Sequence, residues 1–184
     1  KITVVGSINM DTYLNVPQLP HTGKTVITST SSVYPGGKGI NQAIGASRLG
    51  HRVTLIGNVG SDLDSDNIYR ALNENGVETH GVKRCLQTDT GKAYIFVDSN
   101  GDSMISILTG ANGIFTPQDI CEKEHLFENT GYCLIQSEIP LDTMREACRM
   151  AHKYHAKTIV KPSACSSMTR EMLADIDIII PNED

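Results

Sequence analysis

The sequence predicts an α/β fold, in which a doubly wound and mainly parallel sheet carries helices on both faces and a small second β-sheet projects from it. Short apolar runs recur at residues 2–5, 53–56, 132–135, 158–160 and 176–180. Such runs are typical of strands that are buried on both faces of a parallel sheet. Segments with helical spacing lie between them, and this alternation favours a doubly wound sheet.

The helices are predicted from apolar stripes and from the residues that end them. Residues 142–155 have apolar side chains three or four positions apart, at Met144, Ala147, Cys148, Ala151 and Tyr154. They form one stripe on a helix. Residues 40–49, 66–75 and 117–125 are shorter candidates. The pairs Leu49-Gly50 and Asn75-Gly76 indicate helix ends closed by glycine.

Two segments interrupt the alternation and predict the second sheet. Residues 12–33 are rich in Thr, Ser and Val, and residues 93–97 and 104–108 are β-type runs around an Asn-Gly turn. Asn-Gly between two such runs is a strong hairpin signal. We therefore expect an α/β core at residues 1–11, 35–90 and 113–184 and a small second β-sheet at residues 12–34 and 91–112.

Composition narrows the classes of function. The 184 residues carry a net charge of −5, with their basic residues scattered, so nothing favours binding to nucleic acid. No apolar run approaches the roughly 18 residues of a membrane helix. The five cysteines are odd in number and contain no C-x-x-C pair, which argues against a disulfide framework or a structural zinc site. We expect a cytoplasmic protein without nucleic-acid or membrane partners.

The most informative motif is the glycine-rich run at residues 36–41, GGKGIN. Three glycines in four positions let the backbone approach a ligand closely, and the run opens a helix whose free N–H groups face the same point. This predicts a cradle for a polar ligand, with Lys38 and Asn41 beside it. A tight turn before a helix is the alternative. The motif is neither a P-loop nor a dinucleotide fingerprint.

A second motif follows the first strand, where ligands collect in open α/β sheets. Asn9 and Asp11 are two residues apart, so in an extended chain their side chains point the same way. An amide and a carboxylate together suit the hydroxyls of a diol. The alternative is that both residues only cap and turn the chain.

The order of five motifs resembles that of the ribokinase (PfkB) family of carbohydrate kinases. They are residues 6–11 (GSINMD), 36–43 (GGKGINQA), 109–112 (TGAN), 137–140 (SEIP) and 181–183 (PNE). The resemblance spans essentially the whole chain and implies a Rossmann-like, ribokinase-like fold. It implies that the sugar is bound by Asn9, Asp11, Gly37, Lys38, Asn41 and Glu138. It also implies that Asn182 lies near the nucleotide phosphates and magnesium. The second sheet, at residues 12–34 and 91–112, would then be a β lid that covers the sugar and forms a homodimer contact.

The function implied by this resemblance is phosphoryl transfer from ATP to the primary hydroxyl of a pentose, ribose first. Another sugar or a nucleoside is the near alternative. The cofactors implied are ATP and Mg²⁺, with K⁺ bound by residues outside this chain. The family's Gly-Ala-Gly-Asp motif, which holds its catalytic base, has no match here. We therefore expect this chain to be an incomplete kinase without catalytic residues or metal ligands, inactive alone.

Other interpretations remain open. An alternative of a different class is a non-catalytic fragment that binds sugar or dimerises. A third class, a nicotinamide-dependent enzyme, is disfavoured because this chain lacks Gly-x-Gly-x-x-Gly after its first strand. The family commonly has Asn-Pro where this chain has Lys161-Pro162-Ser163, so Lys161 either meets a phosphate, pairs with Glu138 or is a surface substitution. The acids Asp62, Asp64 and Asp66 fit a helix start better than a calcium loop.

Overall fold

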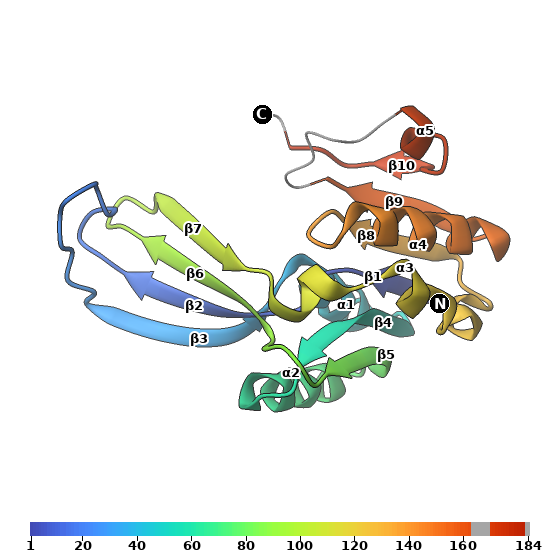
Figure 1. The fold of residues 1–184 in the computed structure, drawn as a ribbon, viewed down its shortest axis with the longest axis horizontal. Coiled ribbons are helices and arrows are strands. Elements are labelled where there is room, and N and C mark those ends of the chain that lie inside the picture. Colours follow the sequence, from blue (N-terminus) through green and yellow to red (C-terminus); the bar gives the residue numbers. More distant parts are fainter. Residues whose placement is uncertain (163–169, 183–184) are drawn as a thin grey trace.

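The main sheet is parallel throughout the part of the chain that is described. The structure is a computed structural model that describes residues 1–162 and 170–182. The strand order of the main sheet is β10-β9-β8-β1-β4-β5 (Figure 1). The strands are β1 (Ile2–Val5), β4 (Val53–Gly60), β5 (Glu78–Cys85), β8 (Tyr132–Gln136), β9 (Lys157–Lys161) and β10 (Ile178–Ile179). Ser163, Glu183 and one of the five cysteines, Cys165, lie outside the described ranges.

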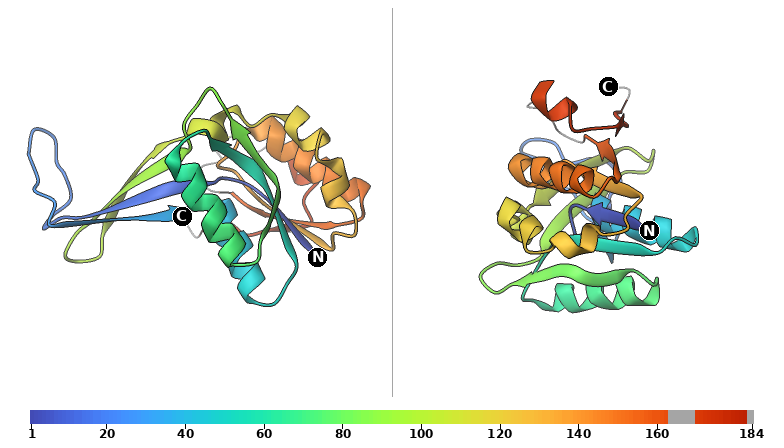
Figure 2. Two further views of the ribbon diagram at one scale, coloured as in Figure 1. Left: turned by 90° about the horizontal axis from the view of Figure 1, so that it is seen from below. Right: turned by 90° about the vertical axis from the view of Figure 1, so that its right-hand side faces the viewer.

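Helices cover both faces of this sheet (Figure 2). One face packs against α1 (Lys38–Arg48) and α2 (Leu63–Glu74), and the other packs against α4 (Leu141–Lys153). A hydrophobic core lies on each face, the first under α1 and α2 and the second under α4. Val4 belongs to the first core and Val5 to the second, so adjacent residues of β1 point to opposite faces of the sheet. The second core also includes Phe115, the C-cap of η1 (Gly110–Ile114), and residues of α3 (Pro117–Cys121), η2 (Glu124–Phe127) and α5 (Arg170–Leu173). This layout confirms the doubly wound α/β prediction.

The second sheet is mixed and projects from the main one (Figure 1). Its order is β3-β2-β6-β7, with β2 (Asn9–Asn15), β3 (Thr30–Gly36), β6 (Gly91–Val97) and β7 (Ser103–Leu108). Strand β2 pairs antiparallel with β3 and parallel with β6. Because β2 begins at Asn9, both Asn9 and Asp11 are carried by the second sheet.

A group of hydrogen bonds joins the second sheet to the core. Asp62 is the N-cap of α2 and accepts from Ser65 N at 2.9 Å. The same carboxylate accepts from Thr90 N and Thr90 Oγ1, each at 2.7 Å, one residue before β6. Burial opposes ionisation of Asp62, but these hydrogen bonds outweigh it and lower its pKa. The prediction of a helix start at this acid is confirmed.

Several elements differ from the sequence-based expectation. Strand β5 was not predicted, β10 is shorter than the apolar run at 176–180, and the helix expected at 117–125 is α3 followed by η2. A capping box between Thr116 and Asp119 starts α3. The glycine-closed ends are confirmed, because Gly50 and Gly76 take φ of 87° and 68°. None of the described helices is long and apolar enough to cross a membrane.

Candidate functional site

The predicted site residues meet at the carboxyl end of the main sheet. Strand β1 lies between β8 and β4, and the chain extends the sheet from β4 on one side and from β8 on the other. Such a reversal of strand order opens a crevice at the carboxyl ends of the strands. The loop after β1 leads into β2, and the segment after β8 carries Glu138.

Close backbone contact explains the glycines at the start of α1. Gly37 is the N-cap with φ of 90°, and a Cβ atom there would lie 2.9 Å from the carbonyl oxygen of Ser7. A Cβ at Gly39 would lie 2.7 Å from the same oxygen. Instead, Gly39 N–H donates to it at 3.0 Å. The first turn of α1 is therefore held directly against the loop that follows β1.

Asp11 is a buried carboxylate with an unused acceptor atom. Its Oδ1 is buried and has no hydrogen-bond partner among the described residues. A Cβ at Gly36 would lie only 1.9 Å from Asp11 Oδ2, so glycine is needed there to admit the carboxylate. Burial raises the pKa of Asp11, outweighing the opposing hydrogen bond from Gly37 N–H. A ligand hydroxyl that donates to Oδ1 would satisfy this acceptor.

Glu138 is held by contacts to both of its carboxylate oxygens. Lys38 Nζ forms an ion pair with Oε1, and Ser7 Oγ donates to Oε2 at 2.6 Å. Ser7 Oγ also accepts from Lys38 N at 3.0 Å. Sequence reasoning gave Ser7 no role, because its partner Glu138 is 131 positions away. The position of Ser7 in the loop after β1 was the available signal.

Asn9 is held by a residue that the sequence analysis left without a role. Asn112, in η1, donates from Nδ2 to Asn9 Oδ1 at 2.8 Å. Both side chains are buried, with 3% of Asn9 and 2% of Asn112 exposed. Asn112 belonged to one of the five motifs, and that was its only signal in the sequence.

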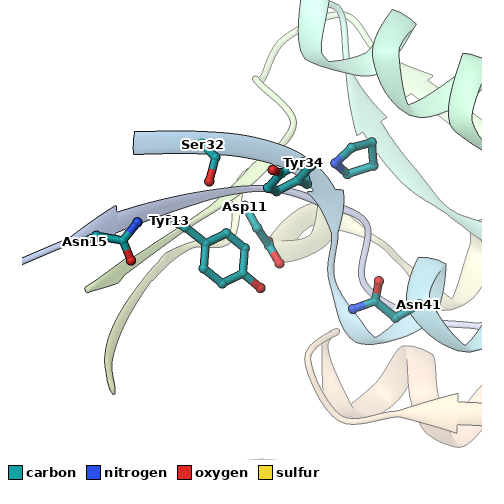
Figure 3. A pocket seen from close by; sticks show the side chains of 7 residues that line it. Asp11, Tyr13, Asn15, Ser32, Tyr34 and Asn41 are labelled. Carbon is teal, nitrogen blue, oxygen red and sulfur yellow. The ribbon is translucent and has the colours of Figure 1, made fainter. Parts of the chain in front are cut away.

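All six residues predicted to bind sugar line one cavity of about 120 Å³, namely Asn9, Asp11, Gly37, Lys38, Asn41 and Glu138. Four residues of the second sheet form its apolar wall, namely Ala93, Ile95, Ile105 and Ile107. A wider hollow of about 450 Å³ shares Asp11 and Asn41 with this cavity and adds Tyr13 and Tyr34. Figure 3 shows the Asp11 carboxylate and Asn41 amide facing this shared space from β2 and α1. The arrangement suits a compact ligand with several hydroxyls.

Asn182 does not line that cavity. It follows β10 and is exposed, and its Oδ1 accepts from Lys161 Nζ at 2.9 Å. Lys161 therefore pairs with Asn182, and the alternative in which it pairs with Glu138 is wrong because Lys38 occupies that place. Within residues 1–162 and 170–182, no group of three or more His, Cys, Asp or Glu could hold a metal ion. We assign no step to Mg²⁺ or K⁺.

Comparison with known proteins shows the family of this chain. The model of the pfkB family of carbohydrate kinases matches residues 1–184. The chain is similar to the ribokinase of Bacillus subtilis, with 34% identity over 182 residues that cover 99% of this chain and 62% of the relative. It is also similar to a bifunctional ribokinase/ribose-5-phosphate isomerase A of Fructilactobacillus sanfranciscensis, with 36% identity over 184 residues that cover 100% of this chain and 34% of the relative.

A solved structure shows the same relation. The ribokinase of Arabidopsis thaliana, complexed with ribose and ATP, is 31% identical with a TM-score of 0.85, and the match covers 99% of this chain and 60% of that one. The chain thus spans less than two thirds of the length of these relatives. Because the family model matches from the first residue to the last, this chain belongs to the pfkB family of carbohydrate kinases.

Proposed function

We propose that the protein containing this chain transfers a phosphoryl group from ATP to the primary hydroxyl of a pentose, with ribose as the first choice. The observation that carries the proposal is the convergence of five polar side chains and the Gly37 backbone on one cavity of about 120 Å³. This volume is below the roughly 300–1,000 Å³ of pockets for drug-sized ligands, which favours a single small sugar. The family and the names of the relatives support the same substrate class.

The residues around the cavity would orient the sugar. Asp11 Oδ1 accepts from one hydroxyl, and Asn9 and Asn41 offer amide groups to others. Lys38 and Glu138 are already joined to each other and bind a further hydroxyl as a fixed donor and acceptor. Holding a substrate in one orientation removes much of the entropic cost of a reaction between two molecules.

The second sheet serves as a lid in this proposal; its strands extend beyond the expected lid bounds of 12–34 and 91–112, because β2 begins at Asn9 and β3 ends at Gly36. Its residues Ala93, Ile95, Ile105 and Ile107 line the cavity and would shield a bound sugar from water. Excluding water strengthens the polar contacts and disfavours transfer of the phosphoryl group to water.

ATP would bind at the same edge of the main sheet, farther along it. Asn182 follows β10 and Glu138 follows β8, and these two strands are two positions apart in the sheet. Neighbouring strands are about 4.8 Å apart, so β10 and β8 are separated by about 10 Å. Lys161 and Asn182 together offer an ammonium and an amide, and both donor types suit phosphate oxygens. ATP supplies the phosphoryl group. We expect no transfer by residues 1–184 alone, because we assign both carboxylates at the cavity, Asp11 and Glu138, to orienting the sugar.

A homodimer through the lid is part of the proposal. Tyr13, Tyr34, Ile105 and Ile107 lie on one face of the lid and are 36%, 57%, 57% and 47% exposed. An apolar face of this kind favours a protein contact, and a second lid would cover it. A cytoplasmic location is supported by free thiols at Cys85, Cys121, Cys133 and Cys148.

The test is a panel of pentoses, hexoses and nucleosides with ATP and Mg²⁺ on the full-length protein. We expect the highest kcat/KM with ribose and a loss of at least tenfold in Asp11→Ala, with the fold retained by circular dichroism. Equal turnover in Asp11→Ala would remove Asp11 from the site. A preference for hexoses or nucleosides would contradict the pentose assignment.

A further inference from the structure

Asn112 makes three hydrogen bonds, and their directions are fixed by the backbone. Its Oδ1 accepts from Ile8 N–H at 2.9 Å. Its Nδ2 donates to the Ile8 carbonyl oxygen at 3.0 Å and to Asn9 Oδ1 at 2.8 Å. A backbone N–H can only donate and a backbone carbonyl can only accept. The two ends of the Asn112 amide are therefore assigned without ambiguity.

This assignment determines the orientation of Asn9 in turn. The Nδ2 group of Asn112 has only hydrogens to offer, so the Asn9 atom that it meets must be the oxygen. The Nδ2 group of Asn9 is then directed away from Asn112, and Asn9 lines the cavity. Asn9 thus presents a donor to the ligand, whereas Asp11 beside it presents an acceptor at Oδ1.

The pair of amides fills the space beside Gly91, the first residue of β6. A Cβ atom at Gly91 would lie 2.3 Å from Asn112 Nδ2 and 2.4 Å from Asn9 Oδ1. Gly91 is also the register partner of Asn9 in the lid sheet. Asn112 itself lies in η1, directly after β7. The contact between the two amides therefore sits where strands β2, β6 and β7 join the core.

We propose that Asn112 is a positioning residue for the sugar site, which fixes the Asn9 amide so that Asn9 donates, and does not accept, a hydrogen bond at the sugar. This inference rests on the proposed function of the same cavity. It adds a residue that lies outside the cavity and determines the donor–acceptor pattern inside it. A hydroxyl that donates to Asp11 can accept from Asn9, so a hydroxyl between them satisfies both groups.

The test uses Asn112→Asp in the full-length protein. Aspartate keeps the acceptor for Ile8 N–H but places a second oxygen against both Asn9 Oδ1 and the Ile8 carbonyl oxygen. The backbone carbonyl is fixed, whereas the Asn9 amide is expected to turn and present its oxygen to the cavity. We expect the Kd for ribose, measured by calorimetry, to rise about tenfold to a hundredfold, because a polar contact is lost. In an Asn9→Ala background the same substitution should change Kd less than twofold, because Asn112 acts through Asn9.

A purely structural role would give a different result. In that case Asn112→Asp would weaken binding by the same factor with and without the Asn9 side chain, and the proposal would be refuted. An unchanged Kd in the single variant would refute it as well. The matched control is Thr116→Ala, which removes the cap of α3 in the same segment without touching Asn9. It should leave the Kd for ribose within twofold of wild type.

Two further measurements keep the inference separate from the proposed function. In Gly91→Ala the added methyl displaces the amide pair, so ribose affinity should fall even if Asn112→Asp does not fold. Without sugar, the NMR resonances of the Asn9 side-chain amide should shift in Asn112→Asp and stay unchanged in Thr116→Ala. Wild-type protein that binds no pentose would refute the proposed function, whereas unshifted Asn9 resonances would refute the role of Asn112.

Discussion

Substituting Gly36 with alanine should weaken the proposed sugar binding while leaving the fold intact. The Cβ atom would lie 1.9 Å, 2.2 Å and 2.6 Å from Oδ2, Cγ and Oδ1 of Asp11. Gly36 is not among the glycines with positive φ, so its backbone accepts alanine. The atoms in conflict belong to a side chain that can rotate. We therefore expect the carboxylate to move and the backbone to stay.

The size of the effect follows from this displacement. To restore a normal contact of about 3.5 Å, the Asp11 carboxylate must move by about 1.5 Å, and a hydrogen bond to the sugar does not survive such a shift. A hydrogen bond to a charged group contributes about 1.5–3 kcal/mol, so ribose affinity should fall about tenfold to 150-fold. The free energy of unfolding should change by less than about 1 kcal/mol, because releasing a buried carboxylate offsets the local rearrangement.

Calorimetry with ribose and chemical denaturation of the full-length protein measure the two quantities. The matched control is Gly45→Ala, because Gly45 lies in α1 and a Cβ atom there would meet nothing within 4 Å. This control should stabilise the fold by about 0.5–1 kcal/mol and leave binding unchanged. Wild-type affinity in folded Gly36→Ala would show that Asp11 does not bind the sugar through this carboxylate position.

Three further predictions concern groups around the site. Burial raises the pKa of Asp11 above its usual value of 3.8. If the ionised carboxylate binds the sugar, ribose affinity should fall about tenfold for each pH unit below that raised pKa. Calorimetry across a pH series should find no such fall in Asp11→Asn. Ser7→Ala removes hydrogen bonds to Glu138 and to the first turn of α1, so it should destabilise the protein by about 1–3 kcal/mol in urea and raise the KM for ribose; an unchanged KM would show that Glu138 needs no such support. Asp62→Ala removes the cap of α2 and two hydrogen bonds from Thr90, and should cost at least about 1 kcal/mol at pH 7. The pKa of Asp62 is lowered in the fold, so its contribution to the free energy of unfolding is present above pH 3.8 and is lost as the pH falls through the folded pKa. The stabilities of wild type and variant should therefore converge in acid. A difference that stays constant with pH would contradict this account.

The strands that sequence reasoning found are those with buried, continuous apolar runs. Strand β5 escaped because residues 78–85 (ETHGVKRC) contain no continuous apolar run: the strand lies at the edge of the sheet, and only three of its eight residues are buried. Strand β10 was predicted too long for a related reason, since Ile178, Ile179 and Ile180 are apolar but 43–50% exposed. Apolar character alone does not tell an edge strand from a central one.

The site shows a similar division between local and long-range signals. The glycine-rich turn and the Asn9–Asp11 pair are local patterns, so the sequence could predict them. The supports of the site are long-range contacts, because Ser7 meets Glu138 across 131 positions and Asn112 meets Asn9 across 103. No periodicity or spacing in a single sequence reports such contacts, which arise only when β1, β8 and η1 come together in the fold.

The groups that we propose to bind the sugar are divided between the second sheet and the main body, since β2 carries Asn9 and Asp11, whereas Lys38 begins α1 and Glu138 follows β8. A sugar held by both sets favours whichever angle between the sheets lets it reach both, and a ligand shifts such an equilibrium only by its difference in affinity for the two arrangements. An analogue without the hydroxyl that would meet Asp11 would have nearly equal affinity for the two arrangements of the sheets. It would therefore bind weakly and would also leave the angle between the sheets unchanged, so selection among sugars would act on shape as well as on affinity.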